Sequence, residues 1–242
     1  MKKTDQINLT PELQEGLEKK VKALHEIIQD IGETYPSVAF ASSFGAEDIV
    51  LHHAIHQSSN KIAIFTLDTG RLPNETYELI SKVKQIFNQK IEVFFPDQKK
   101  IEAYMNENGV NAFYESLELR KECCYIRKVE PLIRALKARN AWVTGMRAEQ
   151  SQTRETLKIK EFDSGHNIDK INPLVDWSDS EVWAYIKLND LPYNRLHDKF
   201  YPSIGCAPCT RAISIGEDIR AGRWWWENPK NKECGLHSKD EK

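Results

Sequence analysis

The chain has 242 residues, of which 40% are hydrophobic and 29% are charged. This length lets one domain bury a substantial apolar core, so disulfide crosslinks are not needed to hold the fold. Lysine and arginine number 34 and aspartate and glutamate 36, and the formal net charge of -2 argues against a broad nucleic-acid surface. No apolar run reaches the ~20 residues of a membrane span. The polar N-terminus and the odd count of five cysteines predict a cytoplasmic protein with reduced thiols.

Strands and helices alternate along most of the chain. Apolar side chains recur every three or four positions over residues 9–31, which predicts an amphipathic helix. Short apolar strands are expected at residues 38–41, 62–65, 91–95 and 142–144, with helices after residue 49 and at 74–87, 98–107 and 125–139. This order predicts parallel βαβ units, and therefore an α/β fold with a Rossmann-like parallel sheet and helices on both faces. The loops at the carboxyl ends of the strands would form the ligand crevice.

The composition changes near residue 226, where the chain becomes polar and has little to bury. We expect an α/β domain over residues 1–225 and a mobile C-terminal tail over residues 226–242. Three consecutive tryptophans, Trp224 to Trp226, are expected to pack where the tail leaves the domain. They are not assigned to base stacking, because no basic groove accompanies them.

Two strand-to-helix loops carry candidate anion-binding groups. The first contains Ser42, Ser43 and Gly45. The two serine hydroxyls, together with backbone N–H groups at the start of the following helix, can hold phosphate or sulfate. Alone it is a weak signal, because it lacks the Gly-Lys-Ser/Thr ending of a P-loop and an ordinary capped turn would look the same. The second loop contains Asp68 and Gly70 and would lie beside the first on one sheet edge. The alternative is that Asp68 caps the next helix while Gly70 relieves the turn.

Four of the five cysteines form two close pairs, Cys123 with Cys124 and Cys206 with Cys209. In a reducing compartment such pairs more often ligate metal than cross-link. Zinc and an iron–sulfur cluster are both open, but adjacent thiolates point apart and suit different irons of a larger cluster. The pattern therefore favours a [4Fe–4S] cluster, with buried structural thiols as the remaining alternative.

The fifth cysteine, Cys234, stands apart on the expected tail, three residues before His237. A thiol near cationic groups can be a nucleophile, and a mobile segment can carry it between sites. The alternative, which the chemistry alone slightly favours, is an inert exposed thiol. Arginines gather beyond residue 120, whereas none precedes Arg71. Their forked guanidinium groups suit a small anion such as sulfate or phosphate. The arginines considered are Arg127, Arg147, Arg154, Arg211, Arg220 and Arg223.

Together these motifs resemble the assimilatory adenylyl-sulfate (APS) reductases, which are relatives of the 3′-phosphoadenylyl-sulfate (PAPS) reductases and of the PP-loop ATP pyrophosphatases. The resemblance runs from about residue 38 to residue 237. Residues 42–48 are similar to the modified PP-loop, 67–72 to the second nucleotide motif, 123–132 and 203–210 to the cluster motifs, 144–154 to the substrate arginine segment and 233–237 to the C-terminal nucleophile motif.

The resemblance implies reduction of APS to sulfite and AMP in assimilatory sulfate reduction. Cys234 would attack the sulfate sulfur and form an S-sulfonate, which reduced thioredoxin or glutaredoxin would resolve. One [4Fe–4S] cluster per chain would be held by Cys123, Cys124, Cys206 and Cys209. The implied substrate-binding residues are Ser42, Ser43, Gly45, Asp68, Gly70, Arg127, Lys128, Arg147, Arg154, Arg220, Arg223 and His237.

PAPS reductases proper lack the two cysteine pairs, so their presence points to APS, although some cluster-bearing relatives accept both nucleotides. We further expect a homo-oligomer with no nucleic-acid or membrane partner. A PP-loop ATP pyrophosphatase is one rival, but it should show Ser-Gly-Gly-x-Asp-Ser in place of residues 43–48 and would not need Cys234. A non-catalytic iron–sulfur sensor or nucleic-acid module is another, and it would leave the substrate-type motifs without a role.

Overall fold

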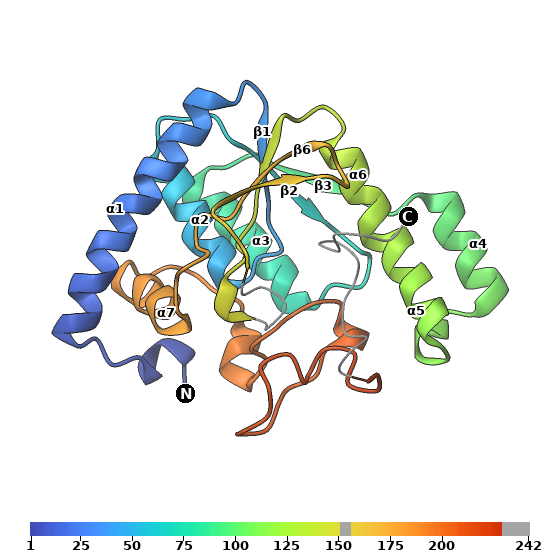
Figure 1. Cartoon of the computed structure of the whole chain (residues 1–242). Coiled ribbons are helices and arrows are strands. Elements are labelled where there is room, and N and C mark those ends of the chain that lie inside the picture. The colour runs from blue at the N-terminus through green and yellow to red at the C-terminus, as the bar shows by residue number, and fades with distance from the viewer. Residues whose placement is uncertain (151–155, 229–242) are drawn as a thin grey trace.

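The computed structural model describes residues 1–150 and 156–228. Within these ranges a six-stranded sheet lies at the centre of the molecule, with strand order β3-β2-β1-β4-β6-β5 (Figure 1). All neighbouring strands are parallel except β5 and β6, which are antiparallel. The strands are β1 (Val38–Ala41), β2 (Ala63–Leu67), β3 (Ile91–Phe94), β4 (Ala141–Val143), β5 (Lys160–Asp163) and β6 (Ile168–Ile171).

The α/β expectation is confirmed, because the four predicted strands are all present and lie side by side in parallel. The hairpin of β5 and β6 was not predicted. Three of the four residues of β5 and two of the four residues of β6 are charged, so neither strand forms the apolar run from which the other strands were recognised.

Seven α-helices accompany the described strands. They are α1 (Pro11–Thr34), α2 (Ala46–Gln57), α3 (Asn74–Phe87), α4 (Gln98–Asn108), α5 (Leu117–Cys124), α6 (Glu130–Leu136) and α7 (Asp179–Leu188). The first begins at a Thr10 cap, whose side chain accepts from the N–H of Leu13, and has proline in its first turn. In the part of the chain that is described, no helix combines the length and the apolarity that crossing a membrane would need.

Side chains of β1 alternate between two cores, and this alternation places the helices on opposite faces of the sheet. Val38 and Phe40 belong to a large apolar core that also contains residues of α1, α2, α3 and α7. Ala39 points to the other face, where it packs in a smaller core with Leu132 and Leu136 of α6. Helices therefore cover both faces, as expected.

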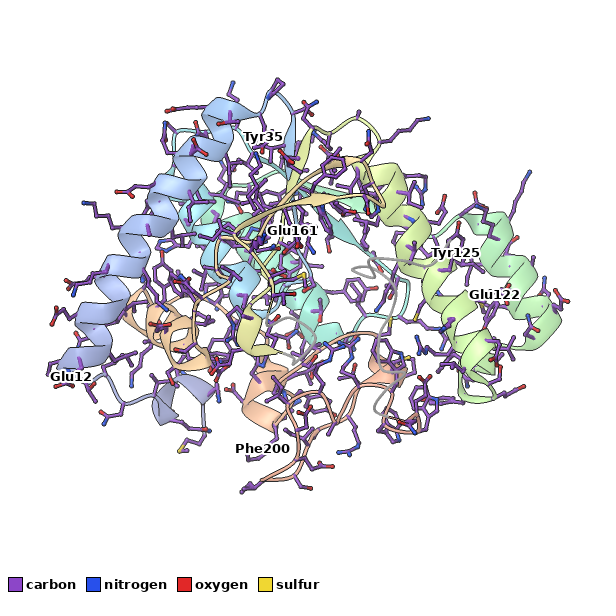
Figure 2. All side chains as sticks on the ribbon, in the orientation of Figure 1. Glu12, Tyr35, Glu122, Tyr125, Glu161 and Phe200 are labelled. Atoms are coloured by element: carbon purple, nitrogen blue, oxygen red, sulfur yellow. The ribbon has the colours of Figure 1, made fainter. Side chains whose placement is uncertain are left out.

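The helix expected over residues 125–139 differs in the structure. It begins earlier, at Leu117, and its middle is a π-helical turn over Tyr125–Val129 that joins α5 to α6. A π turn fits one extra residue into a helix and is often found at functional sites. Half of the surface of Tyr125, the first residue of the π turn, is exposed (Figure 2 labels Tyr125 and Glu122 on this helical arm). Cys123 and Cys124 immediately precede the π turn.

Trp224 and Trp226 pack as expected, whereas 39% of Trp225 is exposed. Trp224 is buried, and the ring of Trp226 lies 4.5 Å from that of Tyr114. Residues 226–228, at the start of the expected tail, are described, and Glu227 pairs with Arg120 of α5. Residues 229–242 lie outside the described residues.

Candidate active site

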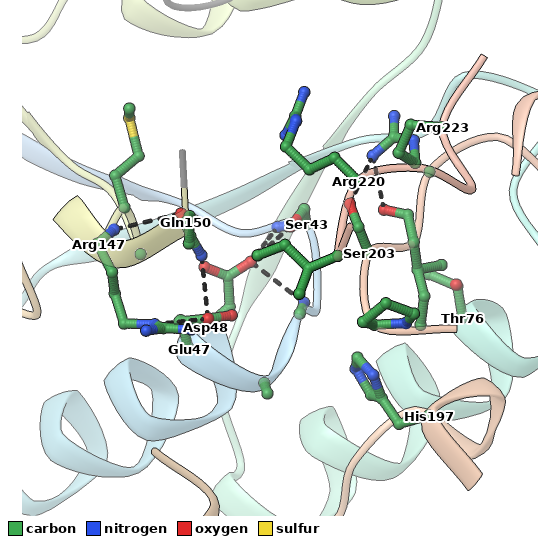
Figure 3. Close-up of a pocket in the computed structure, with 18 of the residues that line it drawn as sticks. Ser43, Glu47, Asp48, Thr76, Arg147, Gln150, His197, Ser203, Arg220 and Arg223 are labelled. Carbon is green, nitrogen blue, oxygen red and sulfur yellow. Dashed lines mark hydrogen bonds and ion pairs between the residues drawn. The ribbon is translucent and has the colours of Figure 1, made fainter. Parts of the chain in front are cut away.

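A cavity of about 680 Å³ opens at the carboxyl ends of β1, β2 and β4 (Figure 3). β1 and β4 are neighbours in the sheet, but the chain visits β2 and β3 between them. The sheet order therefore reverses direction between β1 and β4, and such a switch point is where α/β sheets hold their ligands. The loop after β1, residues 42–45, and the loop after β4, residues 144–147, both line the cavity.

The loop after β1 is organised around Asp48, in the first turn of α2. The Asp48 carboxylate accepts from the backbone N–H of Ser43 at 2.7 Å, from the Ser43 hydroxyl at 2.8 Å and from the N–H of Gly45 at 3.3 Å. The sequence predicts that these donors face a bound anion, whereas in the structure they donate to the carboxylate of Asp48. Burial raises the pKa of Asp48 to about 6, although the Ser43 donors act in the opposite direction.

Ser42 is held from the other side of the loop by His52 of α2. The Ser42 hydroxyl lies 3.0 Å from Nε2 of His52 and accepts from the N–H of Phe44, whose backbone has a φ of 61°. The other ring nitrogen of His52 lies 2.7 Å from Gln89. Burial lowers the pKa of His52 to about 4, so the imidazole is neutral at physiological pH. His52 therefore shapes the loop.

Arg147 follows β4 and lines the cavity, as the sequence predicts for a substrate-binding residue, but it is already paired. Its guanidinium lies 2.8 Å from Glu47, 2.8 Å from Glu149 and 3.5 Å from Asp179 (Figure 3 shows the Glu47 contact). Only 4% of the Arg147 side chain is exposed. The arginine thus fastens the loop after β4 to α2 and α7.

Asp68 and Gly70, in the loop after β2, are not among the residues that line the cavity. Asp68 is buried and accepts from the N–H of Gly70 and from the hydroxyl of Tyr77, both at 2.8 Å. Gly70 has a φ of 68°, a left-handed conformation that favours glycine. Both residues shape this loop, and neighbouring Thr69 does line the cavity.

Cations from distant parts of the chain also line the cavity. Lys128 comes from the π turn, and Arg220 and Arg223 come from the segment before Trp224 (Figure 3). Arg223 donates to the Ser203 hydroxyl at 3.3 Å. The structure therefore brings these three predicted residues to the cavity. Arg154, Cys234 and His237 lie outside the described residues.

The two cysteine pairs meet beside this cavity. All four thiols are buried and line one small chamber, together with four cationic side chains. We call this the thiol chamber. It is lined by Arg71, Phe113, Arg120, Cys123, Cys124, Arg127, Lys128, Cys206, Pro208, Cys209 and Trp224. Cys123 and Cys124 come from the end of α5, whereas Cys206 precedes and Cys209 ends a short 3-10 turn more than 80 residues later.

The lining of the thiol chamber fits an anionic metal cluster. Among the described residues, Nε of Arg127 and Nε1 of Trp224 are buried N–H donors without a hydrogen-bond partner. The Cys206 thiol donates to the Thr69 hydroxyl oxygen at 3.2 Å. No three His, Cys, Asp or Glu side chains in the described ranges are gathered around a single metal ion.

The thiol chamber and the cavity are neighbours. Lys128, Cys206 and Trp224 line both. The Trp224 ring has the cationic groups of Arg120, Lys128 and Arg223 at 4.9, 5.9 and 4.7 Å from its centroid. The buried Trp224 ring therefore positions cationic groups at the boundary between the cavity and the thiol chamber. An anion bound at this boundary could contact them.

The sequence reasoning missed several residues at this site. His197 lines the cavity with its Nε2 buried and without a partner among the described residues (Figure 3). Lys3 reaches the same cavity from the N-terminal segment. Neither stands in a recognisable motif. Arg120 could have been recognised from its spacing. It precedes Cys124 by four positions on one helix, so the two side chains share a helix face.

The comparisons with known proteins agree with this geometry. Residues 37–212 match the family described as "Phosphoadenosine phosphosulfate reductase domain". This match covers well over half of the chain. The chain therefore belongs to the phosphoadenosine phosphosulfate reductase domain family.

Within that family the chain is similar to proteins named adenosine 5′-phosphosulfate reductase. It is 55% identical to one from Burkholderia cepacia over 95% of this chain and 90% of the relative. It is 53% identical to one from Allochromatium vinosum over 89% and 84% of the two chains. Among solved structures it resembles a phosphoadenylyl-sulfate reductase from Candida auris in complex with phosphate. That structure has a TM-score of 0.68 and 28% identity, covering 86% of this chain and 99% of the other.

Proposed function

We propose that the protein reduces adenosine 5′-phosphosulfate to sulfite and AMP with electrons from reduced thioredoxin or glutaredoxin. The observation that carries this proposal is the shared wall of the two spaces, in which Lys128, Cys206 and Trp224 line both the cavity and the thiol chamber. A nucleotide held at the switch point would present its anionic end to the cations of this wall. The names of the relatives support the same substrate.

In the proposed reaction the Cys234 thiolate attacks the sulfate sulfur. The bond from that sulfur to the bridging oxygen breaks, AMP leaves with this oxygen, and a Cys234 S-sulfonate forms. A thiolate of the reduced dithiol partner then attacks Sγ of Cys234 and releases sulfite. The second thiol of the partner resolves the mixed disulfide, so two electrons pass from the partner and Cys234 is restored.

The cations near Trp224 would act on the charge of the substrate. Attack by a thiolate on a sulfate group brings negative charges together, and positioned cations offset this repulsion in the transition state. Lys128, Arg220 and Arg223 line the cavity, and Lys128 also lines the thiol chamber. We expect them to contact the phosphosulfate, with His237 helping to hold the segment that carries Cys234.

We further propose that Cys123, Cys124, Cys206 and Cys209 hold one [4Fe–4S] cluster per chain. Burial raises the pKa of Cys209 to about 12, so metal ligation is what would remove its proton in this chamber. When bound, the cluster would supply fixed charge beside the substrate and cross-link α5 to the segment that contains Cys206. The test is the iron and acid-labile sulfide content of the anaerobically purified protein, compared with Cys206→Ser. Iron-free protein with full activity would contradict the cluster assignment.

The activity is tested by sulfite release from APS and from PAPS in parallel, with reduced thioredoxin as the electron donor. We expect APS to be the better substrate. Mass spectrometry after mixing with APS in the absence of thiol should show the S-sulfonate on Cys234. The Cys234→Ser variant should lose both the adduct and the activity, and an equally active variant would refute the nucleophile. A cytoplasmic location and a homo-oligomer belong to the same proposal, and the oligomer is tested by light scattering.

A further inference from the structure

The N-terminal segment is fastened to the domain before the first long helix begins. A 3-10 turn spans Lys3–Gln6 and lies beside α7 (Figure 1). The backbone N–H of Lys3 donates to the Asp198 carboxylate at 2.6 Å, and Nζ of Lys187 donates to the carbonyl oxygen of Ile7 at 2.8 Å. Ile7 also packs against the large apolar core. The turn is therefore a fixed part of the domain, although it precedes the residues that match the family.

This turn places one charged side chain at the cavity. Lys3 and Gln6 both line the cavity. Nζ of Lys3 lies 3.9 Å from Oδ2 of Asp179 and 5.6 Å from the centroid of the Trp183 ring, and 30% of the Lys3 side chain is exposed. Asp179 and Trp183 belong to α7 and line the cavity as well. The Lys3 ammonium is therefore held at the cavity wall by a cation–π contact and a long ion pair.

The cavity wall around Lys3 carries more negative than positive charge. The Arg147 guanidinium faces three carboxylates, those of Glu47, Glu149 and Asp179, at 2.8, 2.8 and 3.5 Å. All three acidic residues line the cavity. Three carboxylates against one guanidinium leave two negative charges in excess, and the charge of Lys3 lowers that excess to one. A cleft with an excess of negative charge lowers the local concentration of an anionic nucleotide, so this cation matters for binding.

Resting on the proposed function, we propose that Lys3 is a substrate-binding cation, whose charge attracts the anionic nucleotide into the cavity. Asp179 pairs with both Lys3 and Arg147, and Figure 3 shows Arg147 apart from Arg220 and Arg223. Lys3 therefore adds positive charge in a part of the cavity where those two arginines do not lie. It acts on binding, because it stands with the carboxylates rather than with the cations near Trp224.

The test compares the affinity of charge-matched variants for AMP and for adenosine, which is the same nucleoside without the charged phosphate. Lys3→Gln removes the ammonium, and its backbone N–H can still donate to Asp198. Lys2→Gln is the matched control, because it removes the same charge from the neighbouring exposed residue, which is not part of the cavity lining. Lys3→Gln should weaken AMP binding about threefold at low ionic strength and leave adenosine binding unchanged. Lys2→Gln should match the wild type for both ligands, and Lys3→Arg should restore the affinity for AMP.

The reaction supplies a second readout. In Lys3→Gln the KM for APS should rise by the same factor as the loss of AMP affinity, with kcat unchanged. The difference from the wild type should disappear in about 1 M salt, where the Debye length is about 3 Å.

The outcomes separate the role of Lys3 from the proposed function. Wild-type affinity for AMP in Lys3→Gln would overturn the role of Lys3. An equal loss for adenosine, or a loss that persists in about 1 M salt, would also overturn it, in favour of a structural role for the N-terminal turn. A wild-type protein that releases no sulfite from APS would overturn the proposed function itself.

Discussion

Asp48 accepts two hydrogen bonds from Ser43, one from its backbone N–H at 2.7 Å and one from its hydroxyl at 2.8 Å. The contact folds the loop after β1 back onto the first turn of α2. It also places a buried carboxylate where the sequence predicts an anion-binding loop. A substrate anion approaching Ser43 would meet this carboxylate, so the protonation of Asp48 is a property that experiments should address.

We expect Asp48 to titrate near pH 6, because burial raises its pKa from an ordinary 3.8 to about 6. The folded state then holds the proton more tightly than the unfolded state. The contribution of Asp48 protonation to the stability of the fold is fully present below pH 3.8 and is lost as the pH rises through about 6. Carbon-13 NMR of the aspartate carboxyls should show this titration, and the resonance should vanish in Asp48→Asn. Titration of that resonance near 3.8 would contradict the prediction.

Arg147→Ala should destabilise the fold strongly, because the substitution leaves Glu47 without its cation in a largely buried position. Breaking such a pair by removing one partner costs about 3–5 kcal/mol. Glu149→Gln is the matched control, since the Glu149 side chain is 58% exposed and its loss should cost under about 1 kcal/mol. Urea unfolding of both variants gives the two values. Similar free energies of unfolding for the two would show that the ion pairs of Arg147 are solvated in solution.

Gly145→Ala should impair APS binding. A methyl group at Gly145 would come within 2.4 Å of Oδ1 of Asp48 and 3.4 Å of its backbone nitrogen, so the loops after β1 and β4 would have to separate. Gly16→Ala is the control, because nothing lies within 4 Å of that position on α1. It should raise the free energy of unfolding by about 0.5–1 kcal/mol. An unchanged KM for APS in Gly145→Ala would mean that the two loops are less rigidly packed than described.

Deletion of Tyr125 should abolish iron binding while leaving the helix content nearly unchanged. Removing one residue from the π turn lets the helix run on as a regular α-helix, and it rotates Cys123 and Cys124 by about 100° relative to α6. Iron analysis and circular dichroism measure the two effects. Tyr125→Ala keeps the residue count and should keep its iron. Full iron content in the deletion variant would show that the π turn does not set the direction of these cysteines.

The sequence determined strands β1 to β4 of the sheet and the two cysteine pairs that line the thiol chamber. Apolar runs separated by helical periodicity are local patterns, so β1 to β4 could be read directly, and the close spacing of Cys206 and Cys209 identified them as a pair. The hairpin of β5 and β6 was hidden by its charged side chains. The π turn could not be predicted, because the sequence has helical spacing both before it, in α5, and after it, in α6.

Only the tertiary structure decided which polar groups face one another. Arg147 and Glu47 lie 100 positions apart, and Arg120 and Glu227 lie 107 apart, so no local pattern announces either ion pair. Asp68 and Gly70 stand in a motif, yet neither lines the cavity, which Thr69 between them does. Asp68 is buried and Gly70 is exposed. Sequence patterns record which residues are present and their spacing along the chain. A charged side chain that is removed from water needs a partner of opposite charge, because an unpaired buried charge is costly. Which residue becomes that partner depends on how the sheet, the helices and the C-terminal segment pack together.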